Sequence, residues 1–277
     1  MSDVLLQFAH ISDTHLLKPG QALDFGDIGP EWAEYARQVL ALRHDAGAVV
    51  GALAQEINAL PARLDFVLHT GDVAGQPQSP EDYDIMAGWL GQINYPVFYL
   101  PGNHDDADGV RRLLDGAATS ESLDYTFERN GVQIVCLDSN HSIVPHGGGL
   151  DDRQLTWLES ICAAQDDRPL VVSLHHHPVP LGVPWLDALA LSNGDDLHRI
   201  LLTARARLRG VFFGHIHYGI DVLRDGILYS SAPGAWYQFS GWPGWATPAL
   251  DERASPGFSV VTITRDRTFV RRHFYRV

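Results

Sequence analysis

Residues 5–15 read LLQFAHISDTH, an apolar run that ends in Asp13, Thr14 and His15. The run over residues 5–12 favours a buried β-strand, so the polar residues stand at its carboxyl end. Four more apolar runs, over residues 64–70, 97–101, 170–174 and 208–213, show the same arrangement. The residues that follow these four runs are Gly71-Asp72, Gly102-Asn103-His104-Asp105, His175-His176-His177-Pro178 and Gly214-His215-Ile216-His217.

The rest of the chain carries helical spacing and further strands. Helices are expected over residues 30–60 (as two helices or one broken helix), 81–91, 109–114, 151–164 and 194–206, with Asn193 as the N-cap of the last. Strands are expected over residues 132–139, 221–224, 227–231, 258–264 and 269–275, the last two forming a hairpin around Arg265-Asp266-Arg267. This order predicts an α/β (α+β) fold in which two mixed sheets pack together with helices outside. We expect a single domain over residues 1–277, with elaborations at about 21–54 and 233–251.

The composition is that of an acidic globular protein. In 277 residues, 20 Lys and Arg stand against 34 Asp and Glu, which gives a formal net charge of −14. This balance argues against binding to nucleic-acid polymers or to anionic membrane surfaces, since both require a basic footprint. It leaves small phosphate esters open, because a bound metal ion inverts the local field.

The sequence contains few features that indicate a cellular compartment. The first residues, MSDVLLQFAHISDTH, lack the basic start of a signal peptide, and no stretch approaches about 18 apolar residues, so no membrane span is expected. The two cysteines are Cys136, on an expected strand, and Cys162, on an expected helix. We expect two buried free thiols rather than a disulfide, and a cytoplasmic protein.

The polar residues that follow the five strands predict a metal site. In open α/β sheets, ligands gather beyond the carboxyl ends of the strands, so these residues are expected to form one cluster. Imidazole, carboxylate and amide ligands without thiolate suit Mn²⁺, Fe²⁺, Zn²⁺ or Co²⁺, and the cysteines lie outside the motifs, which excludes a closed structural zinc site. Two ions require a shared anionic ligand, for which Asp72 is the natural candidate.

The five motifs, in this order from Asp13 to His217, resemble the signature of the calcineurin-like metallophosphoesterase superfamily. Within it, residues 174–180 (LHHHPVP), Gly182 and residues 185–187 (WLD) make the chain similar to the class III 3′,5′-cyclic-nucleotide phosphodiesterases. The resemblance implies a four-layer α-β-β-α sandwich and a centre of two divalent metal ions. Manganese or iron (Fe²⁺/Fe³⁺) is the first expectation for these ions, with Zn²⁺ or Co²⁺ as alternatives.

The resemblance also implies a ligand set. One ion is assigned to Asp13, His15, Asp72 and His217. Asp72 then bridges to the second ion, which Asn103, His215 and one of the three consecutive histidines complete. His175 is preferred over His176 as that ligand, because it directly follows the strand and leaves the Pro178-Val179-Pro180 turn aligned with the family.

His104 is expected to lie outside the metals, close to the substrate phosphate. There it stabilises the phosphoryl oxygens or protonates the leaving alkoxide. Asp105 either orients His104 or caps the loop. Contacts to the substrate are expected from His15, Asp72, Asn103, His104 and His217.

The resemblance implies an enzyme that hydrolyses 3′,5′-cyclic nucleotides, with cyclic AMP giving 5′-AMP. A hydroxide shared by the two ions would attack phosphorus. The alternatives are a broad phosphodiesterase acting on glycerophosphodiesters, a phosphomonoesterase, and a non-catalytic interaction module with this fold. A metallo-β-lactamase-type hydrolase is excluded, because it requires His-x-His-x-Asp-His.

Two segments are candidate walls of the substrate pocket. They are residues 183–191 and the aromatic run 235–239, which either stacks on an adenine or packs in a core or interface. The expected partner is a small-molecule phosphodiester. A homodimer is a further expectation, formed through the C-terminal hairpin or the aromatic run.

Overall fold

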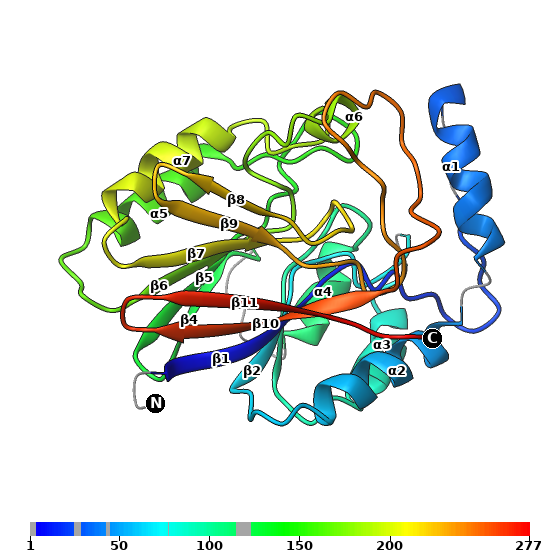
Figure 1. Cartoon of the computed structure of the whole chain (residues 1–277), viewed down its shortest axis with the longest axis horizontal. Coiled ribbons are helices and arrows are strands. Elements are labelled where there is room, and N and C mark those ends of the chain that lie inside the picture. The colour runs from blue at the N-terminus through cyan, green and yellow to red at the C-terminus, as the bar shows by residue number, and fades with distance from the viewer. Residues whose placement is uncertain (1–3, 25–28, 43–44, 77, 115–122) are drawn as a thin grey trace.

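The computed structural model describes residues 4–24, 29–42, 45–76, 78–114 and 123–277. Within these residues, two β-sheets pack face to face at the centre of the molecule (Figure 1). The strands of the first sheet, in spatial order, are β11 (Thr268–Phe274), β10 (Gly257–Thr264), β1 (Val4–Ile11), β2 (Phe66–His69) and β3 (Val97–Tyr99). Those of the second are β4 (Tyr125–Arg129), β5 (Val132–Cys136), β6 (Leu170–Ser173), β7 (Leu208–Phe213), β9 (Ile227–Ser231) and β8 (Asp221–Arg224).

Both sheets are mixed. Strands β1, β2 and β3 run parallel, as do β5, β6, β7 and β9. The pairs β1–β10, β10–β11, β4–β5 and β8–β9 are antiparallel, and β10–β11 is the predicted C-terminal hairpin. Because parallel strands end at a common edge, the loops after β1, β2, β3, β6 and β7 can come together.

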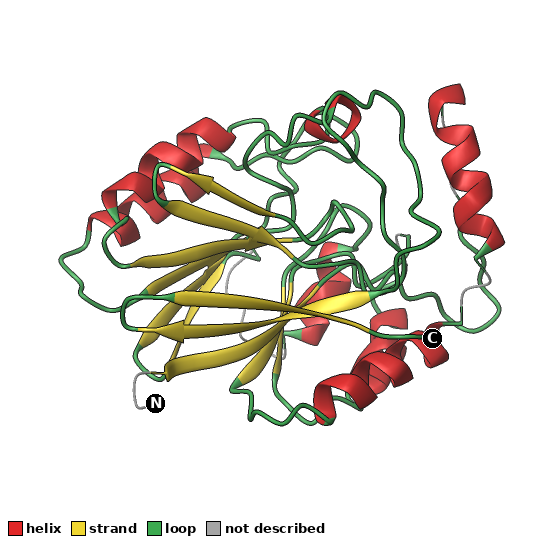
Figure 2. Cartoon of the chain, in the orientation of Figure 1, coloured by secondary structure: helices red, strands yellow, loops and turns green. Residues whose placement is uncertain are grey.

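Helices cover the outer faces of both sheets (Figure 2). Beside the first sheet lie α2 (Ala46–Asn58), α3 (Asp82–Leu90) and α4 (Ala107–Leu113). Beside the second lie α5 (Asp152–Ala163) and α7 (Gly194–Thr203). The result is the expected four-layer α-β-β-α sandwich.

Side chains alternate between the two faces of each sheet. On β5, Ile134 belongs to the core between the sheets, whereas Val135 packs in the core under α5 and α7. Phe8 of β1 stacks on Phe66 of the same sheet at 5.0 Å between ring centroids and meets Phe212 of the other sheet edge-on at 5.4 Å. Such aromatic pairs each add about 0.5–1.5 kcal/mol beyond the area they bury, and the pair of Phe8 and Phe212 contributes to the packing of one sheet on the other.

Described residues of the two segments that we expected to be elaborations, 21–54 and 233–251, pack on each other. The expected helical region 30–60 forms two helices, α1 (Pro30–Ala41) and α2, and Asp45 caps α2 by accepting the backbone N–H of Ala48 at 3.0 Å. The hydroxyl of Tyr35 on α1 lies 2.8 Å from that of Tyr237. A small separate core joins these segments, formed by Tyr35, Val39, Val49, Trp236, Tyr237 and Leu250.

Strand β4 was not predicted from the sequence. It forms a hairpin with β5 through Asn130 and Gly131, whose φ values are 50° and 76°. Asn-Gly flanked by segments with alternating hydrophobic residues is the strongest short-range signal of such a turn. The sequence therefore contains the sign that identifies this hairpin.

The starts of two helices show how loop contacts and capping decide the local structure. Asn193 occupies the N-cap position of α7, but its side chain does not cap the helix. It binds the backbone of Leu150 instead, accepting from N–H at 3.1 Å and donating to the carbonyl at 2.7 Å, which ties two loops together. Helix α4 begins at Ala107, two residues earlier than expected, because Asp106 accepts the backbone N–H of Gly109 at 2.8 Å and caps it.

Cys136 and Cys162 are buried free thiols, as expected. In the part of the chain that the structure describes, no helix has the length and apolar character needed to cross a bilayer.

Candidate metal centre

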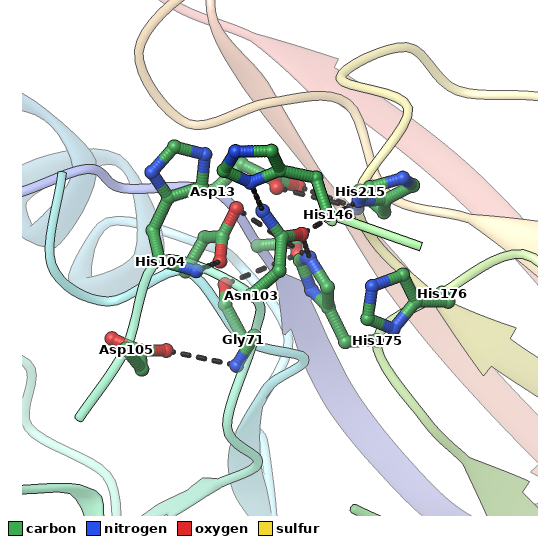
Figure 3. A network of polar contacts seen from close by, with 12 residues as sticks. Asp13, Gly71, Asn103, His104, Asp105, His146, His175, His176 and His215 are labelled. Atoms are coloured by element: carbon green, nitrogen blue, oxygen red, sulfur yellow. Dashed lines mark hydrogen bonds and ion pairs between the residues drawn. The ribbon is translucent and has the colours of Figure 1, made fainter. Parts of the chain in front are cut away.

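The predicted site residues meet at the carboxyl ends of β1, β2, β3, β6 and β7 (Figure 3). Their ligand atoms form two buried clusters, within each of which the atoms lie no more than 4.8 Å apart. The first cluster contains Asp13, His15, Asp72 and His217, and the second contains His175, His176 and His215.

In the first cluster, ring nitrogens and carboxylate oxygens point at one another. Nε2 of His15 lies 3.0 Å from Nε2 of His217 and 3.6 Å from Oδ2 of Asp72. Nε2 of His217 lies 3.3 Å from Oδ1 of Asp13. The carbonyl oxygen of Tyr237 faces Nδ1 of His217 at 3.3 Å and can accept its proton, which leaves Nε2 as a lone-pair donor. Converging donors of this kind fit a cation between them.

Asn103 joins the second cluster. Its Oδ1 lies 2.9 Å from Nδ1 of His215 and 3.1 Å from Nε2 of His175. Nε2 of His175 also lies 3.4 Å from Oδ2 of Asp72, so Asp72 faces both clusters. Nδ1 of His215 thus faces this cluster, whereas its Nε2, on the other side of the ring, is buried and has no hydrogen-bond partner among the described residues.

The three consecutive histidines occupy different environments. His175 directs Nδ1 at the carbonyl of Thr70 (2.7 Å), which fixes its tautomer and turns Nε2 toward Asp72 and Asn103. His176 is hydrogen-bonded through Nδ1 to the hydroxyl of Ser139 at 2.8 Å. His177 is buried farther along, with Nε2 3.9 Å from a carboxylate oxygen of Asp187. His175 is thus the histidine of the three that faces the shared carboxylate.

Several of the expected metal ligands have a strained backbone with a positive φ. Of the eight non-glycine residues that the structure describes with positive φ, five are expected ligands: Asp13 (57°), His15 (45°), Asp72 (54°), His215 (70°) and His217 (50°). Each such conformation costs about 1–3 kcal/mol and persists only where the surroundings enforce it. Strain of this kind gathers at functional sites.

Glycine is required beside Asp72. Gly71 has a φ of 99°, and a Cβ there would lie 2.5 Å from Nδ1 of His175. At Gly102, a Cβ would overlap the carboxylate of Asp72. The two glycines therefore let the loops after β2 and β3 approach closely enough to share that carboxylate.

The electrostatic environment of the two clusters favours a bound cation. Burial lowers the pKa of His15, His215 and His217, that of His217 to about 3, so these rings are neutral and offer lone pairs. Burial opposes ionisation of Asp72, yet the neighbouring His175 and His104 hold its pKa well below the usual range. Against the effect of burial, Asp72 raises the pKa of His175 to about 9. A divalent cation can replace the proton that this pair retains.

His104 and Asp105 have separate tasks. The ring of His104 lies 4.9 Å from that of His15, and its Nδ1 faces the carbonyl of Gly75 at 3.1 Å. The carboxylate of Asp105 accepts the backbone N–H groups of Val73, Ala74 and Gly102 at 2.9–3.1 Å, and the hydroxyl of Tyr83 at 3.1 Å. Two roles were expected for Asp105, orienting His104 or capping the loop. These hydrogen bonds are those of a loop cap.

Of the two expectations for the aromatic run, packing in a core is the one that the structure shows. Trp236 and Tyr237 are buried, and the ring of Tyr237 packs 4.4 Å from His217 and 5.7 Å from His15. The run therefore covers the first cluster. A cavity of about 340 Å³ lies instead beside the second, between the loop after β3, which includes Asn103, and a loop over residues 138–147.

His146, which lies in that cavity wall, was not predicted from the sequence. Its Nδ1 lies 3.1 Å from Nδ2 of Asn103, and its ring stacks 5.4 Å from that of His104. No strand end or spacing marks this residue, which stands in the loop sequence PHGGG. The residues that orient the ligands through backbone carbonyls, Thr70 and Tyr237, carry no side-chain signal either.

Two buried clusters of histidine and aspartate, joined by a shared carboxylate at the edge of two packed sheets, define the class of binuclear metal-dependent hydrolases. The chain belongs to the calcineurin-like phosphoesterase family, whose sequence profile matches residues 6–219. It is therefore an enzyme that hydrolyses phosphate esters.

Three relatives are named phosphodiesterases. The chain is 31% identical over 260 residues to 3′,5′-cyclic adenosine monophosphate phosphodiesterase CpdA of Pseudomonas aeruginosa, covering 93% of this chain and 85% of that one. It is 34% identical over 205 residues to the CpdA of Escherichia coli K12 (74% and 72% covered). It is 30% identical over 217 residues to glycerophosphodiester phosphodiesterase GpdQ of Enterobacter lignolyticus (76% and 70% covered).

The fold agrees with that of solved metallophosphoesterases. A dimetal phosphatase from Danio rerio superposes with a TM-score of 0.64 at 14% identity, over 97% of this chain and 99% of that one. At this identity the likeness establishes the fold alone.

Proposed function

We propose that this protein is a metal-dependent phosphodiesterase that hydrolyses 3′,5′-cyclic nucleotides, converting cyclic AMP to 5′-AMP. The observation that carries the proposal is the position of Asp72, whose Oδ2 lies 3.6 Å from Nε2 of His15 and 3.4 Å from Nε2 of His175. One carboxylate oxygen thus faces a histidine of each cluster. The cyclic nucleotide is inferred from the relatives named for that activity.

The residues fit two divalent ions, with manganese or iron favoured and Zn²⁺ or Co²⁺ as alternatives. The first ion would be held by Asp13, His15, Asp72 and His217, and the second by Asp72, Asn103, His175 and His215. When bound, two such ions neutralise charge on the phosphate and activate water for attack on phosphorus.

His104 is proposed as the general acid. The carbonyl of Gly75 accepts its Nδ1–H, which leaves Nε2 to act on the substrate. In the imidazolium form, Nε2–H donates to a phosphoryl oxygen or transfers its proton to the leaving alkoxide. We assign substrate contacts to His104 and to the ligands His15, Asp72, Asn103 and His217.

The cavity beside Asn103 favours a diester with a neutral alcohol group. Its described lining includes the acidic residues Asp105 and Asp138 and the apolar residues Ile143 and Val144, and it contains no Lys or Arg. An anionic leaving group would find no counter-charge there. A nucleoside meets no such penalty.

A glycerophosphodiester is the second candidate substrate, because the same cavity accepts its neutral or cationic head group and one relative is named for that activity. The test compares kcat/KM of the Mn²⁺-reconstituted protein for cyclic AMP, glycerophosphocholine, bis-(p-nitrophenyl) phosphate and a phosphomonoester. We expect cyclic AMP to give the highest value and the monoester the lowest. A cyclic AMP value far below that of glycerophosphocholine would replace the nucleotide assignment by the second candidate.

Location and assembly are part of the proposal. A cytoplasmic protein accords with the two buried free thiols. A homodimer through the C-terminal hairpin or the aromatic run is also proposed, and the exposed side chains of Phe269 and Phe274 support the hairpin as the interface. Sedimentation analysis gives the mass in solution, and a monomer at all concentrations would remove this part of the proposal.

A further inference from the structure

Asn103 presents two different groups to its surroundings, and its orientation matters to the site. Its carbonyl Oδ1 faces Nδ1 of His215 at 2.9 Å and Nε2 of His175 at 3.1 Å. Its amide Nδ2 faces the opposite direction, toward His146 (Figure 3). Only the carbonyl oxygen has a lone pair to offer a cation, because an amide NH₂ is purely a donor. A reversed amide would point hydrogen atoms into the second cluster.

His146 supplies the acceptor that this orientation requires. Its Nδ1 lies 3.1 Å from Nδ2 of Asn103, so the neutral ring accepts the amide N–H. The loop holds the ring there through an unusual backbone: φ of His146 is 59°, and the N–H of Gly147 donates to the carbonyl of Val144 at 3.0 Å. Strained conformations away from glycine persist where the surroundings enforce them.

We propose that His146 is a positioning residue for the second metal ion, which fixes the amide of Asn103 with its carbonyl toward His175 and His215. The assignment rests on the metal centre in the proposed function and is independent of which phosphodiester is the substrate. Partners of metal ligands commonly account for 10- to 100-fold in metal affinity. The role is thus measurable without any substrate.

Two substitutions of His146 distinguish the loss of its hydrogen-bond acceptor from the effect of backbone strain. His146→Gly removes the ring and tolerates the positive φ, so it tests loss of the acceptor without added strain. His146→Asn places Oδ1 at the same bonded position as Nδ1, and asparagine also adopts this conformation readily. His141→Gly removes an exposed histidine from the same loop and controls for added flexibility.

The experiment titrates Mn²⁺ into the metal-free full-length proteins and follows binding by calorimetry and by electron paramagnetic resonance. We expect two sites in the wild type and in His141→Gly. In His146→Gly one of the two sites should weaken by about tenfold or more, and His146→Asn should bind within about threefold of the wild type. Two unweakened sites in His146→Gly would overturn the proposal, and so would an Asn variant as weak as the Gly variant.

Asn103→Asp provides a second test, in which the effect of His146→Gly is compared between two backgrounds. A carboxylate has two equivalent oxygens and needs no fixed orientation, so His146→Gly should cost little further Mn²⁺ affinity in the Asn103→Asp background. An equal loss in both backgrounds would show that His146 acts by another route. If the wild type bound fewer than two Mn²⁺ ions, the proposed metal centre would be contradicted. The role assigned to His146 would then be contradicted as well.

Discussion

The backbone N–H of His104 donates a hydrogen bond of 2.9 Å to Oδ1 of Asp72. This bond occupies one carboxylate oxygen and leaves Oδ2 to face His15 and His175, at 3.6 and 3.4 Å from their Nε2 atoms. The residue proposed to act on the substrate thus also orients, through its main chain, the carboxylate shared by both clusters. A change to the imidazole of His104 leaves that main-chain bond in place.

Replacement of Asp72 by Asn should prevent the binding of two ions. The amide keeps the shape of the side chain but removes the charge that offsets the repulsion between two cations. Since even partners of ligands account for 10- to 100-fold in affinity or activity, we expect the rate to fall by more than about 100-fold. Emission spectroscopy should find fewer than two ions per chain. The exposed carboxylate of Asp108 offers a control, Asp108→Asn, which should retain both ions; equal metal content in the two variants would refute the shared role of Asp72.

Replacement of His104 by Ala should separate chemistry from metal binding. General acid catalysis contributes about 10²- to 10⁴-fold, so kcat should fall by that factor. Metal content should stay at the wild-type level, because the bond to Asp72 comes from the backbone. The measurement is kcat together with metal content. A variant that keeps both its ions and its full rate would show that His104 takes no part in the reaction.

Replacement of Gly71 by Ala should destabilise the protein. The new Cβ would combine an unfavourable φ of 99° with contacts of 2.5 Å to Nδ1 of His175 and 2.8 Å to the backbone nitrogen of Gly102. We expect a loss of about 2–5 kcal/mol in the free energy of unfolding, measured in urea. Gly88 of α3 is the matched control, since no atom lies within 4 Å of a Cβ there and alanine should stabilise the helix by about 0.5–1 kcal/mol. Similar effects at both positions would contradict the close approach at Gly71.

His10 should make the fold sensitive to acid. Burial, with smaller contributions from Arg272 and His69, lowers its pKa from 6.5 to about 3. Between these values the unfolded chain binds a proton that the folded protein does not, so stability falls as the pH drops through this range. Each such proton costs about 1.4 kcal/mol per pH unit.

His10→Gln isolates this contribution. In metal-free protein, the stability difference between wild type and variant should shrink by about 1.4 kcal/mol for each pH unit below about 6, and stay constant above pH 7. Urea unfolding at several pH values measures it. Parallel stability curves for the two proteins would mean that His10 is not held neutral by the fold.

The sequence allowed prediction of the fold class and of the residues that meet in the site because strand ends are visible in it. Asp13, Asp72 and His217 each stand just beyond an apolar run, and parallel pairing brings such ends to one edge. Strand β4 was not predicted, although the Asn130-Gly131 turn indicates a hairpin at this place. Asn193 is the N-cap residue of α7, as expected, but its side chain does not cap the helix because it is hydrogen-bonded to the backbone of Leu150.

Other features depend on contacts between distant segments and leave no local pattern. The buried position of Tyr237 arises from α1 and from the rings of His15 and His217. His146 comes to Asn103 from 43 residues away in sequence, on a loop with no strand-end motif. The cavity proposed to bind the substrate is lined by that loop, so its position could not be inferred from the sequence.

Anomalous scattering from crystals of the Mn²⁺-loaded protein tests the central claim most directly. We expect two peaks per chain, the first bound by Asp13, His15, Asp72 and His217 and the second by Asp72, Asn103, His175 and His215. A single peak, or two peaks that do not share Asp72, would contradict it.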